Sequence, residues 1–211
     1  MHRTDAFKFN SSSLISRVIT GIHMIIIAFF ILFALWYVFR GRLAQEHVGG
    51  VVYRVHPARD QKRAARMLHR LAQRLQRLID EGLDMYPDDS RLHHLRTRWS
   101  GTLSEVRHGN DIAYSLNKRN IHICIRSADG RIESEEVAMY VLLHEAAHVA
   151  TKSYGHTPQF WRNFQFLLEL AEKISVYTFN DFSSKRTTYC GHKLGKNVIQ
   201  CVKKQTCPSL L

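Results

Sequence analysis

Two histidines and a glutamate form the pattern His-Glu-x-x-His in the middle of the chain, at His144, Glu145 and His148. Residues four apart on an α-helix project from the same face, so both imidazoles can bind one metal ion. Glu145 lies beside them, where its carboxylate can activate a water molecule rather than bind the metal. The pattern also arises by chance, as two histidines on a helix face beside a glutamate in a salt bridge. The surrounding sequence has to decide between these interpretations.

A catalytic zinc ion needs a third protein ligand and an open coordination position. His156 follows about one turn after the helix, behind Gly155, which can adopt the left-handed conformation that ends a helix and turns the chain back. We expect His156 to be the third ligand. Glu169 and Glu172 in the following helix are the alternatives, because carboxylates also bind zinc.

Two helices are expected to position these residues. The first begins after Ser134, a capping residue, with Glu135 and Glu136 against the positive end of the helix dipole. Its other faces are apolar, so it should be largely buried. The second follows Pro158, and its apolar face should pack on the first; this face comprises Phe160, Trp161, Phe164, Leu167, Leu168 and Ala171.

The segments before this pair alternate between helix and strand patterns. Apolar residues recur at helical spacing over residues 58–82, with Gly82 as the closing residue, and a second helix is expected from Asp89 to about Arg107, capped by Asp88 or Asp89. Residues 111–117 and 121–126 alternate between apolar and polar, as half-buried strands do. Residues 40–57 contain Gly49-Gly50 and Pro57 without a sustained period, and are expected to be a linker.

The stretch VLLHEAAHVATKSYGHTPQFWRNFQFLLELAE resembles the WLM and SprT-like minimal zinc metallopeptidases, whose motif is HExxH, a short loop, and a histidine followed closely by an aromatic pair. The similarity extends upstream to DIAYSLNK and IHICIR and downstream to Tyr189-Cys190-Gly191. It looks most like the WLM-type proteases encoded by large DNA viruses and some protists. Seven residues separate His148 from His156, more than in the usual WLM turn.

The resemblance implies zinc ligands at His144, His148 and His156, with Glu145 as the general base that activates the attacking water. A further donor is expected to stabilise the tetrahedral oxyanion, and Tyr154 and Tyr189 are the candidates. Some WLM and SprT relatives act on DNA-bound proteins, so the resemblance offers nucleic acid as an alternative partner, which the membrane anchor argues against.

Residues 19–39, ITGIHMIIIAFFILFALWYVF, contain no formal charge over 21 residues. A helix of this length spans roughly 30 Å, the hydrocarbon thickness of a bilayer. Trp36 and Tyr37 near its end favour the membrane interface, and Arg40 and Arg42 follow. We expect an uncleaved single-pass anchor; a cleaved signal peptide and a buried core helix are the alternatives. The flanking Lys and Arg residues favour a cytosolic C-terminal domain by a narrow margin.

The formal charge of +12 is concentrated near the N-terminus. Residues 1–42 hold five basic residues against one Asp, and residues 54–78 hold eight against Asp60 alone. Six of these arginines recur at helical spacing and form a basic stripe, which could be a solvated face, a contact for anionic lipid headgroups, or a contact for nucleic-acid phosphates: Arg59, Arg63, Arg66, Arg70, Arg74 and Arg77. The stripe lacks the interleaved aromatic residues typical of single-strand binders.

Four cysteines are too few for a disulfide scaffold. Cys124 is expected to be a buried structural thiol. Cys190, Cys201 and Cys207 match no common zinc-finger spacing; a disulfide is expected among them if the domain faces an oxidising compartment, and free thiols if it is cytosolic.

The sequence therefore predicts an α+β protein: an N-terminal tail (1–18), a transmembrane helix (19–39), a linker (40–57), a helical region with the basic stripe (58–110), a small zincin-like metallopeptidase core (111–191) and a basic tail with cysteines (192–211). The expected function is a membrane-anchored, zinc-dependent endopeptidase acting on protein or peptide substrates. The alternatives are a catalytically inactive zinc-fold module that tethers a partner at a membrane, and a DNA-associated protease.

Overall fold

The computed structural model describes residues 11–40, 42–106, 111–127, 129–179 and 187–194, and it divides the chain into two units, Met1–Arg42 and Leu43–Leu211. The first unit contains one helix, α1 (Ser11–Arg40), whose segment Ile19–Tyr37 is long and apolar enough to cross a membrane. This segment is not buried against any described part of the chain. Length and composition therefore support the expected span, although a signal sequence has the same properties.

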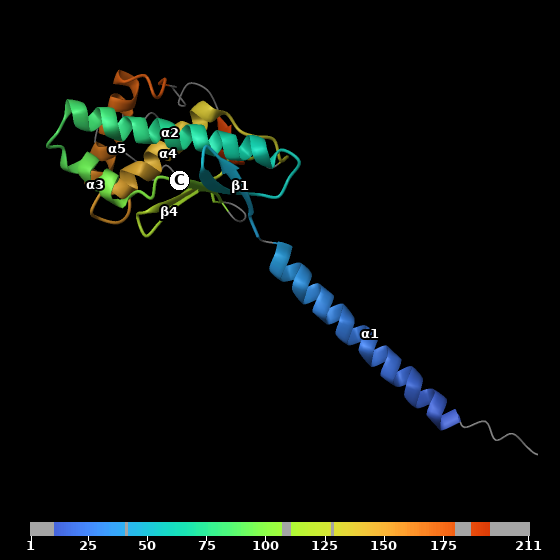
Figure 1. Cartoon of the computed structure of the whole chain (residues 1–211). Coiled ribbons are helices and arrows are strands. Elements are labelled where there is room, and N and C mark those ends of the chain that lie inside the picture. Colours follow the sequence, from blue (N-terminus) through green and yellow to red (C-terminus); the bar gives the residue numbers. More distant parts are fainter. Residues whose placement is uncertain (1–10, 41, 107–110, 128, 180–186, 195–211) are drawn as a thin grey trace, which may run out of the picture. The chain divides into compact units, whose positions relative to one another are not determined.

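The second unit is a mixed α+β domain built on a five-stranded sheet (Figure 1). Its strands are β1 (Ala44–Val48), β2 (Val51–Val55), β3 (Leu103–Glu105), β4 (Ala113–Leu116) and β5 (Asn120–Ile123), in the spatial order β1-β2-β3-β5-β4. The pairs β1–β2 and β4–β5 are antiparallel, and β3 is parallel to both of its neighbours. Because β4 is the last strand in this spatial order, it lies at one edge of the sheet.

Two long helices pack against this sheet and against each other. Helix α2 (Gln61–Met85) lies over β1, β2 and β3, and α4 (Glu135–Ala150) lies over β4 and β5. The predicted apolar face of α2 is entirely buried: Ala64, Leu68, Leu71, Leu75 and Leu78. Helix α4 is apolar on nearly all sides, which fits a helix enclosed by the sheet, α2, α3 (Ser90–Arg98) and α5 (Pro158–Lys173).

Three predicted boundaries were wrong. Residues 40–57 are not merely a linker, because they hold the β1–β2 hairpin, in which Gly49 and Gly50 adopt positive φ angles of 58° and 77°. Helix α2 continues past Gly82 to Met85; a Cβ at Gly82 would lie 2.8 Å from Leu170 Cδ2, so the glycine allows close helix packing. Helix α3 ends at Arg98 rather than near Arg107, and β3 follows it.

The N-terminal caps of α3, α4 and α5 largely follow the sequence. Asp89 caps α3 by accepting hydrogen bonds from the backbone N–H groups of Arg91 and Leu92. Ser134 precedes α4 as predicted, but its side chain makes no capping hydrogen bond. Thr157 caps α5, its hydroxyl accepting from Phe160 N–H at 3.3 Å, so the chain between His156 and α5 is fixed locally.

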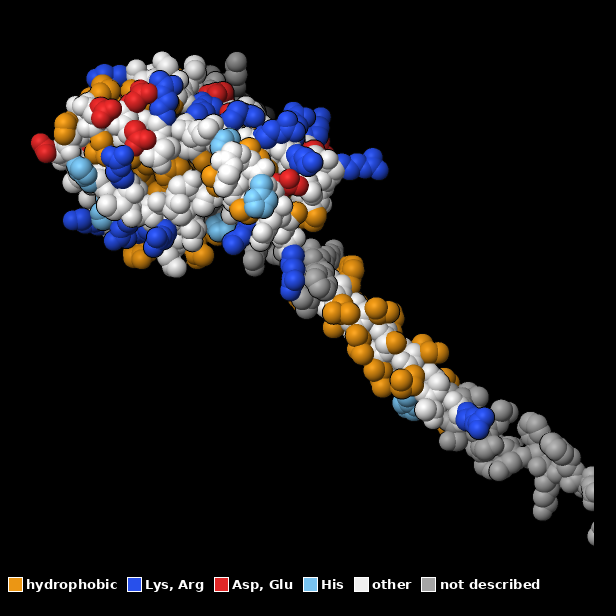
Figure 2. Space-filling view, viewed as in Figure 1, with side chains coloured by type: hydrophobic (Ala, Val, Ile, Leu, Met, Phe, Trp, Pro, Cys, Tyr) orange, Lys and Arg blue, Asp and Glu red, His pale blue; other side chains and the backbone are white. Residues whose placement is uncertain are grey.

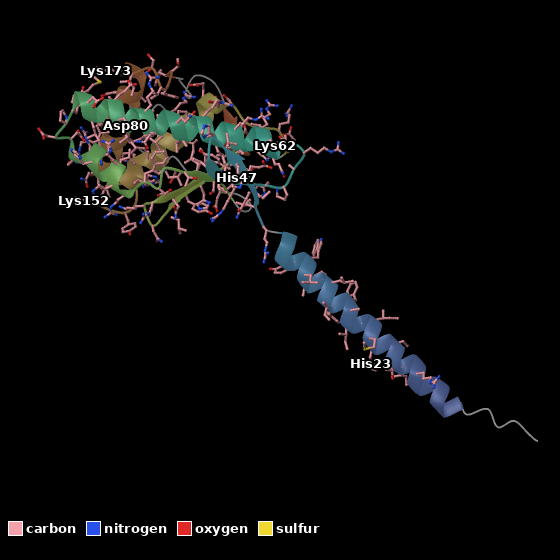
Figure 3. The ribbon with its side chains drawn as sticks, in the orientation of Figure 1. His23, His47, Lys62, Asp80, Lys152 and Lys173 are labelled. Atoms are coloured by element: carbon pink, nitrogen blue, oxygen red, sulfur yellow. A yellow bond between two sulfur atoms is a disulfide. The ribbon has the colours of Figure 1, made fainter. Side chains whose placement is uncertain are left out.

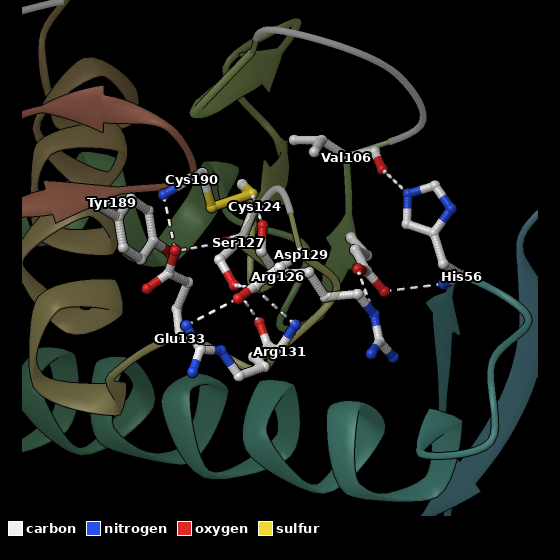
Figure 4. The surroundings of a disulfide bond; sticks show 11 residues. His56, Val106, Cys124, Arg126, Ser127, Asp129, Arg131, Glu133, Tyr189 and Cys190 are labelled. Atoms are coloured by element: carbon white, nitrogen blue, oxygen red, sulfur yellow. Dashed lines mark hydrogen bonds and ion pairs between the residues drawn. A yellow bond between two sulfur atoms is a disulfide. The ribbon is translucent and has the colours of Figure 1, made fainter.

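A disulfide joins Cys124, at the end of β5, to Cys190 (Figure 4). Cys190 lies in the turn of a short two-stranded ribbon, β6 (Thr188–Tyr189) and β7 (His192–Lys193). The expectation that Cys124 is a free buried thiol was therefore wrong: the sulfur is buried, but it is cross-linked over a separation of 66 residues. Cys201 and Cys207 lie outside the described residues.

Candidate metal centre

Helix α4 and the loop after it bring three histidines together. The Nε2 atom of His156 lies 3.0 Å from that of His144 and 3.2 Å from that of His148. Ligand nitrogens around a tetrahedral zinc ion, each about 2.0–2.1 Å from the metal, lie roughly 3.3 Å apart. The three nitrogens therefore converge on one point at the spacing of a metal site, and the triad can bind a metal ion.

The protonation state of the triad also suits a cation. Burial lowers the pKa of His144 well below its ordinary value, lowers that of His148 to about 4, and lowers that of His156. At neutral pH the three imidazoles are neutral, and each neutral ring has one lone pair available for coordination. Converging lone pairs repel one another unless a cation lies between them, so the donor set fits a metal ion.

Aromatic residues of α5 hold the imidazoles in place. The ring of Phe160 stacks on His148, with 4.2 Å between centroids, and Trp161 stacks on His156 at 5.4 Å. His144 is only 3 % exposed and also contacts Phe164. The predicted apolar face of α5 thus forms one wall of the metal centre, and this wall restricts the rotation of all three rings.

Glu145 directly follows His144 on α4, and its carboxylate is buried. Burial raises the pKa of Glu145 to about 7, against the opposing effect of two hydrogen bonds donated by the hydroxyl and the backbone N–H of Ser115. Ser115 belongs to β4, the edge strand. Sequence reasoning missed Ser115, because only the fold places β4 beside α4.

The other candidate ligands lie apart from the triad. Glu169 is exposed and accepts a hydrogen bond from Gln165 at 2.7 Å, and Glu172 accepts from Phe179 N–H at 3.0 Å. Among the described residues, the metal-binding cluster consists of the three histidines, and neither glutamate joins it. The prediction of His156 over the two glutamates agrees with this geometry.

The two tyrosines considered for the oxyanion have different environments. Tyr189 is fully buried in the ribbon, and its hydroxyl donates to the backbone carbonyl of Cys124 (Figure 4). It therefore stabilises the fold and has no free hydroxyl for a substrate. Tyr154, on the loop between His148 and His156, is 82 % exposed, and the ammonium of Lys118 lies over its ring at 4.4 Å.

The predicted basic stripe on α2 divides into two parts. Arg70, Arg74 and Arg77 are tied to the rest of the domain: Arg70 and Arg74 form ion pairs with Glu135 or Glu136 at the start of α4, and Arg77 pairs with Glu81 and donates to the carbonyl of Ile174. Arg70 and Arg74 thus join α2 to the start of α4, and Arg77 joins α2 to the residue that follows α5.

Helix α2 begins at Gln61 rather than at residue 58, so Arg59 lies in the turn before the helix and not on the stripe, whereas Arg63 and Arg66 lie on α2. All three are exposed and form no ion pair with any described residue. Figure 2 shows basic side chains gathered over this end of α2, where Figure 3 labels Lys62. Only this half remains available for an anionic partner.

Comparison with known proteins gives three viral relatives. The chain is 31% identical over 94 residues to uncharacterized protein R325 of Acanthamoeba polyphaga mimivirus, covering 44% of the chain and 48% of the relative. It is 31% identical over 98 residues to uncharacterized protein 136R of Invertebrate iridescent virus 6, covering 40% of the chain and 55% of the relative. It is 42% identical over 60 residues to uncharacterized protein 042R of Invertebrate iridescent virus 3, covering 28% of the chain and 38% of the relative.

The chain thus spans about half the length of the first two relatives. No family model matches it, and no solved structure matches it. All three relatives are described as uncharacterized, so the likeness supplies no activity.

Proposed function

We propose that this chain is a membrane-anchored, zinc-dependent endopeptidase whose metal is held by His144, His148 and His156. The observation that carries the proposal is the convergence of three neutral imidazole nitrogens, with the carboxylate of Glu145 on the adjacent residue of the same helix. Bound zinc would supply a Lewis acid that polarises the scissile carbonyl. Three protein ligands leave the fourth position open for this chemistry.

Glu145 is the general base in this proposal. Its carboxylate takes a proton from the attacking water and delivers it to the leaving amine nitrogen. The hydroxyl and N–H of Ser115 fix the carboxylate, and its pKa near neutrality suits a group that both accepts and returns a proton. The adjacent edge strand supports a peptide substrate, because β4 has no described strand on its outer side and an extended peptide can pair with such an edge.

The test compares Glu145→Gln with the wild-type full chain in detergent micelles, using fluorescein-labelled casein as substrate. Glu145→Gln keeps the three histidines, so we expect unchanged zinc content and a loss of cleavage of at least about 10²-fold, the usual contribution of a general base. Glu169→Gln is the matched control, because Glu169 lies outside the triad, and it should cleave like the wild type.

The alternative, a non-catalytic module that tethers a partner, predicts zinc binding without chelator-sensitive cleavage in the wild type. Full activity of Glu145→Gln would refute the assignment of the base. A DNA-associated role is less well supported, since half of the basic stripe is engaged within the domain.

We also propose that the metal-binding domain faces an oxidising compartment. The flanking charges favour the cytosol by a narrow margin, whereas disulfides persist mainly in oxidising compartments. The Cys124–Cys190 bond therefore favours the opposite orientation to the one expected from the charges. In this arrangement the candidate span Ile19–Tyr37 anchors the domain on the non-cytosolic side of the membrane.

A further inference from the structure

The loop from Thr151 to His156 carries the third histidine, yet it lacks the backbone hydrogen bonds that usually end a helix. Among the described residues, none of its N–H or C=O groups takes part in a backbone–backbone hydrogen bond outside the helices, and no capping bond is formed by the N–H of Thr151. The last carbonyls of a helix need other partners in such a case. The loop must be held by side chains.

Lys118 supplies side-chain hydrogen bonds to the first three residues of this loop. Its Nζ donates to three consecutive carbonyls that directly follow α4: Thr151 at 2.5 Å, Lys152 at 2.8 Å and Ser153 at 2.7 Å. An ammonium group has three N–H donors, so all of them are used. The negative end of the α4 dipole lies at the same place and favours a cation there.

Lys118 is otherwise in an unfavourable position. Its side chain is only 5 % exposed, and no described carboxylate pairs with it. A buried charge is costly unless it is fully hydrogen-bonded. The three carbonyls and the ring of Tyr154 meet this requirement, so the ammonium and the loop depend on each other.

The backbone of Lys118 is strained as well. Asn117 and Lys118 lie in the turn between β4 and β5, closed by a hydrogen bond from Arg119 N–H to the Leu116 carbonyl at 3.1 Å, and both have positive φ angles, 53° and 52°. Asparagine tolerates this left-handed conformation, but lysine does not favour it and glycine would hold the turn without strain. A lysine at such a strained position indicates that its side chain has a structural or functional role.

Further contacts fix the same loop at its two ends. The Thr151 hydroxyl donates to the Ala147 carbonyl at 2.6 Å and accepts from Asn163 Nδ2 at 2.9 Å. At the other end the hydroxyls of Ser153 and Thr157 lie 3.0 Å apart. His156 is carried between these anchors, and Lys118 holds the three residues that lead toward it.

We propose that Lys118 is a positioning residue of the metal centre: it holds the carbonyls of residues 151–153 and thereby presents His156 to the metal. The proposal rests on the proposed metal-binding function of the triad. Loss of Lys118 leaves all three ligands in place but frees the loop that orients the third. Groups outside the ligand set that orient a ligand typically contribute 10–100-fold to metal affinity.

The experiment measures Zn²⁺ affinity of the metal-free full chain in detergent by competition with a chromophoric chelator, and the visible absorption of the Co²⁺ form. Lys118→Met removes the ammonium at nearly constant length, and we expect about 10–100-fold weaker Zn²⁺ binding with a changed Co²⁺ spectrum. Lys118→Arg restores a cationic donor and should recover part of the affinity. Lys152→Met is the matched control, because Lys152 (Figure 3) is exposed in the same loop, and it should bind like the wild type.

Lys118→Gly separates positioning from folding. It removes the side chain and also relieves the left-handed turn, so we expect the metal-free melting temperature to stay at or above that of Lys118→Met while Zn²⁺ binding remains weak. Wild-type Zn²⁺ affinity in Lys118→Met would overturn the proposal, as would a loss of affinity confined to variants that have lost the native circular dichroism. His144→Ala tests the centre itself: unchanged Zn²⁺ binding there refutes the triad, whatever Lys118 does.

Discussion

Removing the Cys124–Cys190 disulfide should lower the free energy of unfolding of the α+β domain by a predictable amount. The bond closes a loop with a sequence separation of 66 residues. The chain-entropy relation for a loop of this length gives an upper value of about 4 kcal/mol. Without the bond, the ribbon β6–β7 has only two residues in each strand, too few for independent stability.

Non-covalent contacts keep the ribbon in place when the bond is absent. The Tyr189 hydroxyl still donates to the Cys124 carbonyl, and the N–H of Cys190 still donates to Glu133 at 2.8 Å (Figure 4). These contacts hold the ribbon against the end of β5 in the reduced protein, so the folded state changes little. We therefore expect the free energy of unfolding to fall by about 2–4 kcal/mol, the usual contribution of a disulfide, with the chain-entropy value as its upper limit. At a urea dependence of about 2 kcal/mol/M, the midpoint of unfolding should fall by roughly 1–2 M.

The assay is urea unfolding of the full chain in micelles, followed by the fluorescence of the buried Trp99 and Trp161. Oxidised wild type should unfold at higher urea than wild type with dithiothreitol, and the Cys124→Ser/Cys190→Ser variant should match the reduced wild type. The variant Cys201→Ser/Cys207→Ser is the control, and it should keep the response to dithiothreitol.

Thiol labelling of protein taken directly from the producing cells tests the compartment in the same experiment. In the Cys201→Ser/Cys207→Ser variant, which keeps only Cys124 and Cys190, we expect both thiols to become reactive only after reduction. Two reactive thiols in that variant before reduction, together with one urea midpoint under both conditions, would refute the disulfide and the oxidising location.

Two further predictions concern charge. The folded-state pKa of His148, about 4, lies below its ordinary 6.5, so its contribution to stability is present above pH 6.5 and is lost as the pH falls toward 4; His144 and His156 act in the same direction. The pKa of Glu145 is raised from 4.5 to about 7, so this carboxyl affects the pH dependence in the opposite direction. Because three histidines outweigh one carboxyl, the metal-free protein should be more stable at pH 6.5 than at pH 5. Urea midpoints at the two pH values measure this, and an unchanged slope in His148→Gln would contradict it. Arg74→Ala should lower the free energy of unfolding by about 1–3 kcal/mol, because the guanidinium donates to the Val176 carbonyl at 2.7 Å and pairs with Glu136 at 2.9 Å. The exposed control Arg63→Ala should lower it by at most about 0.5 kcal/mol. Equal urea midpoints for the two variants would refute the division of the stripe.

The division of the basic stripe shows what helical periodicity leaves undecided. Spacing places six arginines on one face of a helix, but it does not say what faces them. Glu135 and Glu136 lie more than 60 residues from Arg70 and Arg74, and they meet because α2 packs against α4. For the same reason, Glu135 and Glu136 serve both the α4 dipole and the α2 ion pairs.

The β1–β2 hairpin was missed for a different reason. Gly49-Gly50 between two runs containing valine is a signal for a two-residue hairpin, and the register Val48↔Val51 agrees with it. Each strand has only five residues, and short strands carry a weak periodic pattern. The pairing of β2 with β3, which secures the hairpin in the sheet, depends on residues about 50 positions away.

The sequence by itself determined the chemistry available to this protein. Two histidines at i and i+4 share a helix face through local geometry alone, and the glycine before His156 indicates where the chain returns. Tertiary structure decided what holds that chemistry in place. Lys118 and Ser115 come from a hairpin that precedes α4, and Cys190 comes from a ribbon that follows α5. Contacts between such distant segments depend on how the sheet and helices pack, and no local pattern in the sequence records them.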